Sequence, residues 1–136
     1  MRAVVDPNVV ISGALSPHGA PARVLLRWEQ GDFELVVSAM LLEELERALA
    51  YPKLRRHIAE PDASALVRWI KGSAAIGTDP PDEPAIRSAD PGDDYLIALA
   101  AAQRAVLVSG DKHLLALSEA IPVYTPREFL ALLGDE

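Results

Sequence analysis

The sequence predicts an α/β fold with three layers, in which helices cover both faces of a central, mainly parallel sheet of about five strands. Short apolar runs alternate along the chain with segments of helical periodicity, which is the order of elements in parallel α/β proteins. The run at 106–108, Val-Leu-Val, is apolar at every position, as expected of a strand buried on both faces. The chain has 136 residues, the usual size of one domain, so we assign 1–136 to a single domain.

Five segments are expected to form the strands. The first is Arg-Ala-Val-Val at 2–5, and the second is Phe-Glu-Leu-Val-Val at 33–37. A brief third strand is expected at 74–76, the run 106–108 is the fourth, and Pro-Val-Tyr at 122–124 is the last. Apolar and β-branched residues predominate in these runs, and such residues favour buried or half-buried strands.

Helices are expected between and after these strands. Ser38 is a good N-cap, Gly31 ends the helix before it, and Pro52 stops the helix that Ser38 begins. The segment 77–92 is rich in proline, so we expect a long loop there. The expected helices span residues 22–30, 38–50, 53–58, 61–71, 93–103, 112–118 and 126–133.

Composition limits the classes of function. Hydrophobic residues make up 50% of the chain and charged residues 24%, which is ordinary for a globular protein and excludes a disordered chain. Because the chain has no cysteine, disulfides, thiolate zinc sites and cysteine nucleophiles are excluded. No apolar run approaches the roughly 18 residues of a membrane-spanning helix, and the N-terminal apolar stretch is too short for a signal peptide. We therefore expect a soluble, cytoplasmic protein that does not contact the membrane.

The net charge is −7, whereas a domain that binds nucleic acid by bulk electrostatics is basic. Any interaction with nucleic acid must therefore depend on a local site. A basic patch of Lys53, Arg55 and Arg56, together with Lys112, is a candidate for binding RNA phosphates. A solvated helix face explains the same residues. Part of the acidic excess could hold metal cations, and the alternative is that it only keeps the protein in solution.

Acidic residues follow the ends of several predicted strands. Ligands of parallel α/β sheets bind beyond the carboxyl ends of the strands, so these acids are expected to meet at one edge of the sheet. Each acid alone has an ordinary explanation in a turn or the first turn of a helix. Together they would repel one another, and a divalent cation, Mg²⁺ or Mn²⁺ for oxygen ligands alone, would remove that cost. The residues are Asp6 and Asn8, Asp93 and Asp94, and Asp111 after Ser109.

The helix that Ser38 begins carries three glutamates, and its geometry separates them. At about 100° per residue, Glu43 falls opposite the apolar stripe, where it faces water and can pair with Arg47. Glu44 and Glu46 flank the stripe on either side, so helix geometry leaves both open as site residues. The stripe consists of Leu41, Leu42, Leu45, Ala48 and Leu49.

Five blocks of the chain also form a recognisable series. The opening block is Val-Val-Asp-Pro-Asn-Val-Val-Ile-Ser at 4–12. The second spans 38–45 with Leu-Ala-Tyr-Pro-Lys-Leu at 49–54, and the third is Asp-Pro-Gly-Asp at 90–93 with the helix to Ala100. The fourth and fifth are Val-Ser-Gly-Asp-Lys-His-Leu-Leu at 108–115 and Tyr-Thr-Pro-Arg-Glu-Phe-Leu at 124–130. In this order and spacing they resemble the PIN-domain family, especially the VapC-like toxins of prokaryotic toxin–antitoxin pairs.

The resemblance implies an Mg²⁺- or Mn²⁺-dependent endoribonuclease that hydrolyses RNA phosphodiester bonds, with a cognate antitoxin as partner and a homodimeric assembly. It selects Glu44 over Glu46, because the family's glutamate lies six residues after the serine at the strand end. It selects Asp93 over Asp94, which stays as a further candidate ligand. The four acids implied to be catalytic and metal-binding are Asp6, Glu44, Asp93 and Asp111, with Asn8 and Ser109 supporting them.

One residue departs from the family pattern, because Pro7 stands where the family usually has threonine. Proline supplies neither a hydroxyl nor an N–H donor, so one alternative is a PIN fold with weakened catalysis that binds RNA or protein. Two other classes also combine a strand, an acid and magnesium. A haloacid-dehalogenase-like phosphatase needs a second acid where this chain has Asn8, and a phosphoacceptor domain needs a lysine for which Lys112 is the near candidate.

Overall fold

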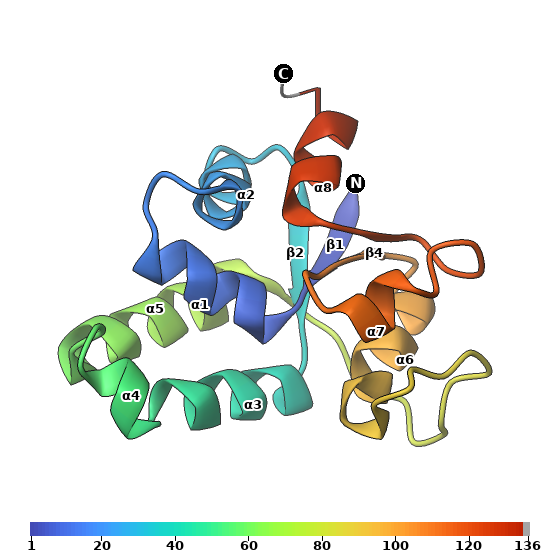
Figure 1. Cartoon of the computed structure of the whole chain (residues 1–136), viewed down its shortest axis with the longest axis horizontal. Coiled ribbons are helices and arrows are strands. Elements are labelled where there is room, and N and C mark those ends of the chain that lie inside the picture. The colour runs from blue at the N-terminus through green and yellow to red at the C-terminus, as the bar shows by residue number, and fades with distance from the viewer. Residues whose placement is uncertain (135–136) are drawn as a thin grey trace.

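The computed structural model describes residues 1–134, and its strands form one sheet in which every pairing is parallel (Figure 1). The order across the sheet is β3-β2-β1-β4-β5. The predicted class and the place of each predicted strand are confirmed. The strands are β1 (Arg2–Val5), β2 (Glu34–Val37), β3 (Ala75–Ile76), β4 (Val106–Val108) and β5 (Val123–Tyr124).

Helices cover both faces of this sheet. Figure 1 shows α1, α2 and α5 on one side of the strands and α6 on the other, so the sheet is the middle of three layers. None of the helices within residues 1–134 has the length and apolar character needed to cross a membrane. The helices are α1 (Pro7–Leu15), α2 (Ala20–Glu29), α3 (Ala39–Leu49), α4 (Pro52–Arg55), α5 (Glu60–Ser73), α6 (Asp94–Ala102), α7 (Lys112–Leu115) and α8 (Pro126–Leu132), with a 3₁₀ turn η1 (Pro91–Asp93) before α6.

The strand order reverses beside the central strand β1. The chain runs from β1 to β2 and β3 on one side, then crosses to β4 and β5 on the other. Val4 pairs with Val36 of β2, while Val5 pairs with Val108 of β4. Parallel α/β sheets bind their ligands in the crevice at such a switch point, beyond the carboxyl ends of the strands. The ends of β1 and β4 are therefore where the fold provides room for a site.

Helix α1 differs from the prediction, which has no helix between residues 6 and 16. Its start signals are clear, because Asp6 accepts a hydrogen bond from the N–H of Asn8 (2.9 Å) and Pro7 occupies the first helical position. The helix packs against α2 and α3 and buries consecutive residues from Val9 to Ile11. These three consecutive buried residues obscure the helical period on which the prediction depends.

Aromatic pairs fix helices to the layers that frame the site. Phe33, at the entry to β2, packs edge-on against Phe129 of α8 with ring centroids 4.9 Å apart. Trp28 of α2 lies 4.6 Å from Trp69 of α5. Such pairs add about 0.5–1.5 kcal/mol to the stabilisation from burial of their area. The two pairs therefore help to hold α2, α5 and α8 in place around the sheet. Both tryptophans are packing residues.

Candidate active site

The centre of the site is Asp6, the first residue after β1. Asp6 is 3% exposed and Ser109, just beyond β4, is 0% exposed. The Ser109 hydroxyl donates a hydrogen bond to Asp6 Oδ2 (2.7 Å), and the same hydroxyl oxygen accepts the N–H of Asp111 (3.0 Å). Asp6 Oδ1 accepts the N–H of Asn8. These bonds join the ends of β1 and β4, and they fix the carboxylate of Asp6 and the backbone of Asp111 at the switch point.

Two further carboxylates line the same cavity, one from α3 and one from the start of α6. The cavity has a volume of about 290 Å³. Glu44 reaches it from α3, whereas Glu46 lies on another side of that helix and pairs with Lys71 of α5 (2.9 Å). The structure thus brings Glu44 to the cavity and leaves Glu46 elsewhere. The four acids expected from the sequence, Asp6, Glu44, Asp93 and Asp111, all line this cavity.

The expected pairing of Glu43 with Arg47 is wrong, because Arg47 pairs with Glu44 instead. Positions three and four residues apart are both neighbours on a helix, so both glutamates are within reach. Glu44 borders a cavity lined by other acids, and their combined negative charge favours the arginine there. Glu43 is exposed to solvent, as its place opposite the apolar stripe predicts.

Asp94 does not line the carboxylate cavity. Its Oδ1 accepts the N–H of Ser88 (2.8 Å), which ties the proline-rich segment 77–90 to the first turn of α6. The same segment is held at its other end by Asp79, whose Oδ2 accepts the N–H of Met40 (3.0 Å). Asp94 therefore supports the loop beside the site, and the structure separates it from its neighbour Asp93.

The crowded acids alter one another's protonation. Burial, together with the negative charges of Asp111 and Asp6, raises the pKa of Asp93 to about 7. Burial also raises the pKa of Asp6, against the lowering effect of its hydrogen bonds from Asn8 and Ser109. A carboxyl group whose pKa is raised in the folded state destabilises that state when it ionises. A proton or a cation at the cavity would relieve this cost.

The donor set fits a hard divalent cation, because every candidate ligand is a carboxylate oxygen. Asp93 Oδ2 is buried and makes no hydrogen bond to any described residue. Among residues 1–134, however, no three Asp, Glu or His side chains stand close enough to form a ready-made metal cage. Glu44 is turned to Arg47, and Asp111 Oδ1 accepts the N–H of His113 (2.7 Å). Holding a cation with all four acids therefore requires their side chains to move closer together, and we expect Glu44 to leave Arg47 as they do.

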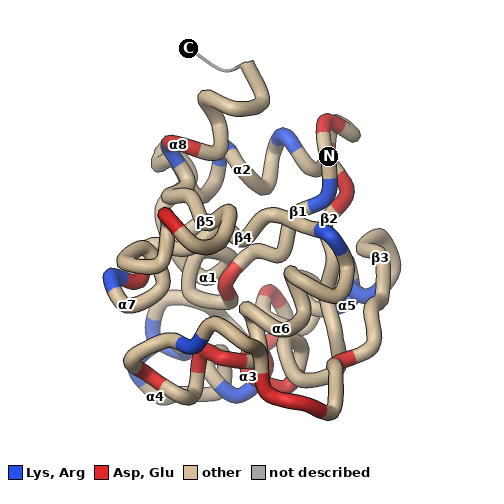
Figure 2. Tube along the Cα trace, turned by 90° about the vertical axis from the view of Figure 1, so that its right-hand side faces the viewer, with Lys and Arg blue, Asp and Glu red and all other residues tan. Residues whose placement is uncertain are grey.

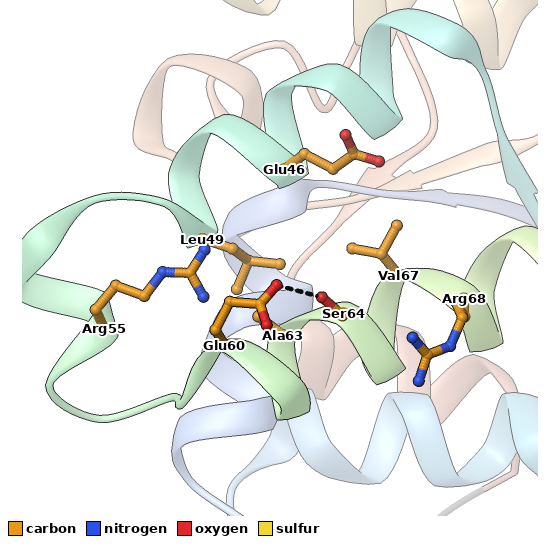
Figure 3. A pocket seen from close by; sticks show the side chains of 8 residues that line it. All are labelled: Glu46, Leu49, Arg55, Glu60, Ala63, Ser64, Val67 and Arg68. Atoms are coloured by element: carbon orange, nitrogen blue, oxygen red, sulfur yellow. Dashed lines mark hydrogen bonds between the residues drawn. The ribbon is translucent and has the colours of Figure 1, made fainter.

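The expected RNA-binding residues occupy two separate places. Lys112 directly follows Asp111 and is exposed at the rim of the site. Lys53 and Arg56 are exposed on and beside α4. Arg55 is half-buried and lines a different cavity of about 390 Å³ between α3 and α5 (Figure 3). Figure 2 shows acidic positions around α1, α3 and α6, and these elements contribute residues to the carboxylate cavity.

Among the described residues that line these cavities, the sequence prediction missed Asp90, Tyr95 and Arg127. Tyr95, in the first turn of α6, lines the carboxylate cavity, and its position two residues after Asp93 was the available signal. Arg127 lines a larger hollow of about 690 Å³ that shares Asp6 and Asp111 with that cavity. Arg127 comes from α8, and no spacing in the sequence connects it with either acid.

A comparison with protein families agrees with the fold and with the acidic residues at the switch point of the sheet. The model of the family described as "PIN domain" matches residues 2–113, and the chain belongs to this family, as its motifs predict. The chain is also 24% identical over 140 residues to the uncharacterized protein MJ1680 of Methanocaldococcus jannaschii, a match that covers 96% of this chain and 90% of that protein.

Three solved structures share the fold at low sequence identity. VapBC2 from Rickettsia felis, bound to a DNA fragment from its promoter, matches with a TM-score of 0.62 and 12% identity over 92% of this chain and 98% of that one. FitAcB from Neisseria gonorrhoeae matches with a TM-score of 0.59 and 19% identity, and the match covers 92% of this chain and 98% of that one. A domain of a functionally unknown protein from Methanocaldococcus jannaschii matches with a TM-score of 0.56 and 16% identity, and the match covers 91% of this chain and 89% of that one. These likenesses establish the architecture.

Proposed function

We propose that this chain is a metal-dependent endoribonuclease that hydrolyses RNA phosphodiester bonds and acts as the toxin of a toxin–antitoxin pair. PIN domains are generally nucleases, and membership of that family is shown. The observation that carries the proposal is the gathering of Asp6, Glu44, Asp93 and Asp111 around one cavity at the switch point of the sheet. The family match removes the phosphatase and phosphoacceptor alternatives.

The four carboxylates are the residues that would hold Mg²⁺ or Mn²⁺. When bound, such a cation activates water and stabilises the charge on the phosphate during hydrolysis. The chain's own contribution is position, because Ser109 and the N–H of Asn8 fix both oxygens of Asp6. The Ser109 hydroxyl also holds the backbone at Asp111, so the ends of β1 and β4 keep a constant separation.

The partners follow from the same proposal. The likeness to VapBC2 and FitAcB supports a cognate antitoxin, and we propose a homodimer for the nuclease itself. Lys112 at the rim of the site would contact the RNA backbone, while Lys53, Arg55 and Arg56 form a second candidate contact around α4. A cytoplasmic location accompanies this proposal, because that is where a prokaryotic cell holds its RNA.

A PIN fold with weakened catalysis is the second candidate, and Pro7 is the observation that favours it. Pro7 lines the carboxylate cavity, so the hydroxyl of a threonine at this position would lie beside Asp6. The missing N–H has no such consequence, since the first position of a helix has no intrahelical acceptor for it. The doubt about activity therefore concerns the hydroxyl alone.

The test is cleavage of end-labelled single-stranded RNA by the full chain with Mg²⁺, with Mn²⁺ and with a chelator. We expect cleavage only with a cation, and its loss in Asp6→Asn. Glu43→Gln is the matched control, because it changes an exposed acid on the helix that carries Glu44. RNA that binds without being cleaved under all three conditions would favour the second candidate. RNA that neither binds nor is cleaved would contradict the ribonuclease and restrict the second candidate to binding protein.

A further inference from the structure

A larger hollow adjoins the carboxylate cavity at the carboxyl ends of β1 and β4. Its volume is about 690 Å³, and sites for small ligands usually have roughly 300–1,000 Å³. Asp6, Asn8 and Asp111 line both the hollow and the carboxylate cavity. A ligand held at these acids can therefore extend into the hollow, whose other walls come from α1 and from the first turns of α2 and α8.

The walls of the hollow combine apolar and polar groups, as sites for small ligands usually do. Ala20, Pro21 and Pro126 are partly exposed there and offer apolar contacts to a base or to the carbon atoms of a ribose. The side chains of Asn8 and Ser12 are exposed and make no hydrogen bond within residues 1–134. Both can donate or accept a hydrogen bond, so the hollow suits one nucleoside.

Arg127 brings positive charge to this hollow and does not line the carboxylate cavity. Its side chain is exposed, and no hydrogen bond or ion pair within the described part of the chain engages it. The backbone beneath it is fixed, because Thr125 and Glu128 form a capping box at the start of α8. An arginine with a fixed backbone and a free guanidinium group is suited to binding a phosphate.

The order of charges along the hollow matches the repeat of an RNA strand. Each nucleoside in a strand lies between two phosphates, so a phosphate held at the acids brings a second phosphate one nucleoside away. Ionised Asp6 and Asp111 repel this second phosphate, whereas Arg127 attracts it. The hollow is lined by the acids and by the arginine, and it has room for the nucleoside that separates the two phosphates.

We propose that the hollow is the subsite for one nucleotide next to the cleaved bond, and that Arg127 binds the phosphate at the far end of this nucleotide. The inference rests on the proposed ribonuclease function and extends its site along the strand. Arg127 acts here on substrate binding and has no part in the chemistry at the acids.

The first test measures binding without cleavage. The probe is a short fluorescent single-stranded RNA with Mg²⁺, and the background is Asp93→Asn, which removes a proposed metal ligand so that the RNA stays intact. We expect Arg127→Gln to weaken binding about tenfold. It should also lower the slope of log affinity against log salt concentration by about 0.7, the loss of one phosphate contact on a single strand.

Arg68→Gln is the matched control, because it removes an exposed arginine of α5 that does not line the hollow. It should leave the affinity and the slope unchanged. An unchanged affinity and slope in Arg127→Gln would overturn the inference and leave the hollow to a protein segment. If the wild type cleaves no RNA but Arg127→Gln still weakens binding, the proposed function fails and the RNA subsite stands.

The second test fills the hollow. Ser12→Phe adds a ring at a position that lines the hollow and not the carboxylate cavity. Ala14→Phe is its control, because Ala14 is also exposed on α1 and lines neither space. We expect Ser12→Phe to weaken RNA binding by roughly tenfold, the contribution of one bound base, and Ala14→Phe to have no effect. Equal affinities for the two variants would show that the strand takes another path and overturn the inference.

Discussion

Replacing Asp93 with asparagine should stabilise the metal-free protein, although it removes a proposed metal ligand. The pKa of Asp93, about 7 against an ordinary 3.8, corresponds at about 1.4 kcal/mol per unit to roughly 4 kcal/mol of destabilisation when the group ionises. The side chain is partly exposed, and screening by solvent reduces this to about 1–2 kcal/mol. Asp93 makes no side-chain capping bond to α6, so asparagine loses only a favourable interaction of about 0.3–1 kcal/mol with the helix dipole.

The sign of the pH dependence follows from the raised pKa. In the wild type, the contribution of Asp93 to stability is fully present below its unfolded pKa of 3.8 and is lost as pH rises through about 7. Asparagine carries no charge at any of these pH values. The two metal-free proteins should therefore unfold with similar free energies near the acid end of this range and diverge as pH increases, with Asp93→Asn the more stable.

Thermal unfolding in the presence of a chelator measures this effect. A net gain of about 1 kcal/mol corresponds to a rise of roughly 3–6 °C in melting temperature for a chain of this size. Asp94→Asn is the matched control, because Asp94 lies next in the chain but holds the N–H of Ser88 outside the carboxylate cavity; it should give no such rise. A fall in melting temperature for Asp93→Asn at neutral pH would show that Asp93 is a structural cap and refute the reasoning from charge crowding.

Three further predictions concern residues around the same cavity. Glu44→Gln should lower cleavage by orders of magnitude and Glu43→Gln by no more than a few-fold; equal effects in a cleavage assay would contradict the assignment of Glu44. Arg47→Gln should tighten Mn²⁺ binding, measured by calorimetry, because Glu44 no longer has to leave a cationic partner; weaker binding would count against a role for Glu44 as ligand. Pro7→Thr should raise cleavage or metal affinity several-fold, since loss of a group that orients a metal ligand typically lowers affinity or activity by about 10- to 100-fold. The same change should lower the free energy of unfolding by about 0.4–1 kcal/mol, because the unfolded chain gains conformational freedom without the proline. A loss of stability with unchanged cleavage and affinity would show that Pro7 is harmless.

The sheet was predictable because its signal is local. Runs such as Val106–Val108 are apolar at every position, and the structure buries β4 between β1 and β5. Helix α1 was missed because Val9, Val10 and Ile11 are all buried, which removes the periodic pattern of an amphipathic helix. Its start signals, Asp6 as N-cap and proline at the first position, were present but had no such pattern to support them.

The site was predictable only in part. The acids follow strand ends or begin a helix, so their meeting at one edge follows from the topology of a parallel sheet. Helix geometry alone could not decide whether Glu44 or Glu46 is the site residue. The structure distinguishes them, because Lys71 of the neighbouring α5 pairs with Glu46. Tyr95 lines both the carboxylate cavity and the cavity beside the proline-rich segment, and no spacing in the sequence encodes this placement. Arg127 reaches the site from a distant helix for the same reason.

The central claim is that Asp6, Glu44, Asp93 and Asp111 together hold a divalent cation, and a crystal grown with Mn²⁺ tests it most directly. Anomalous scattering locates the metal without reference to any assumed ligand. The account predicts a peak in the carboxylate cavity, with oxygens of these acids at roughly 2.0–2.6 Å and Glu44 released from Arg47. A well-occupied peak elsewhere on the chain, with the carboxylate cavity free of metal and Glu44 still paired with Arg47, would contradict it.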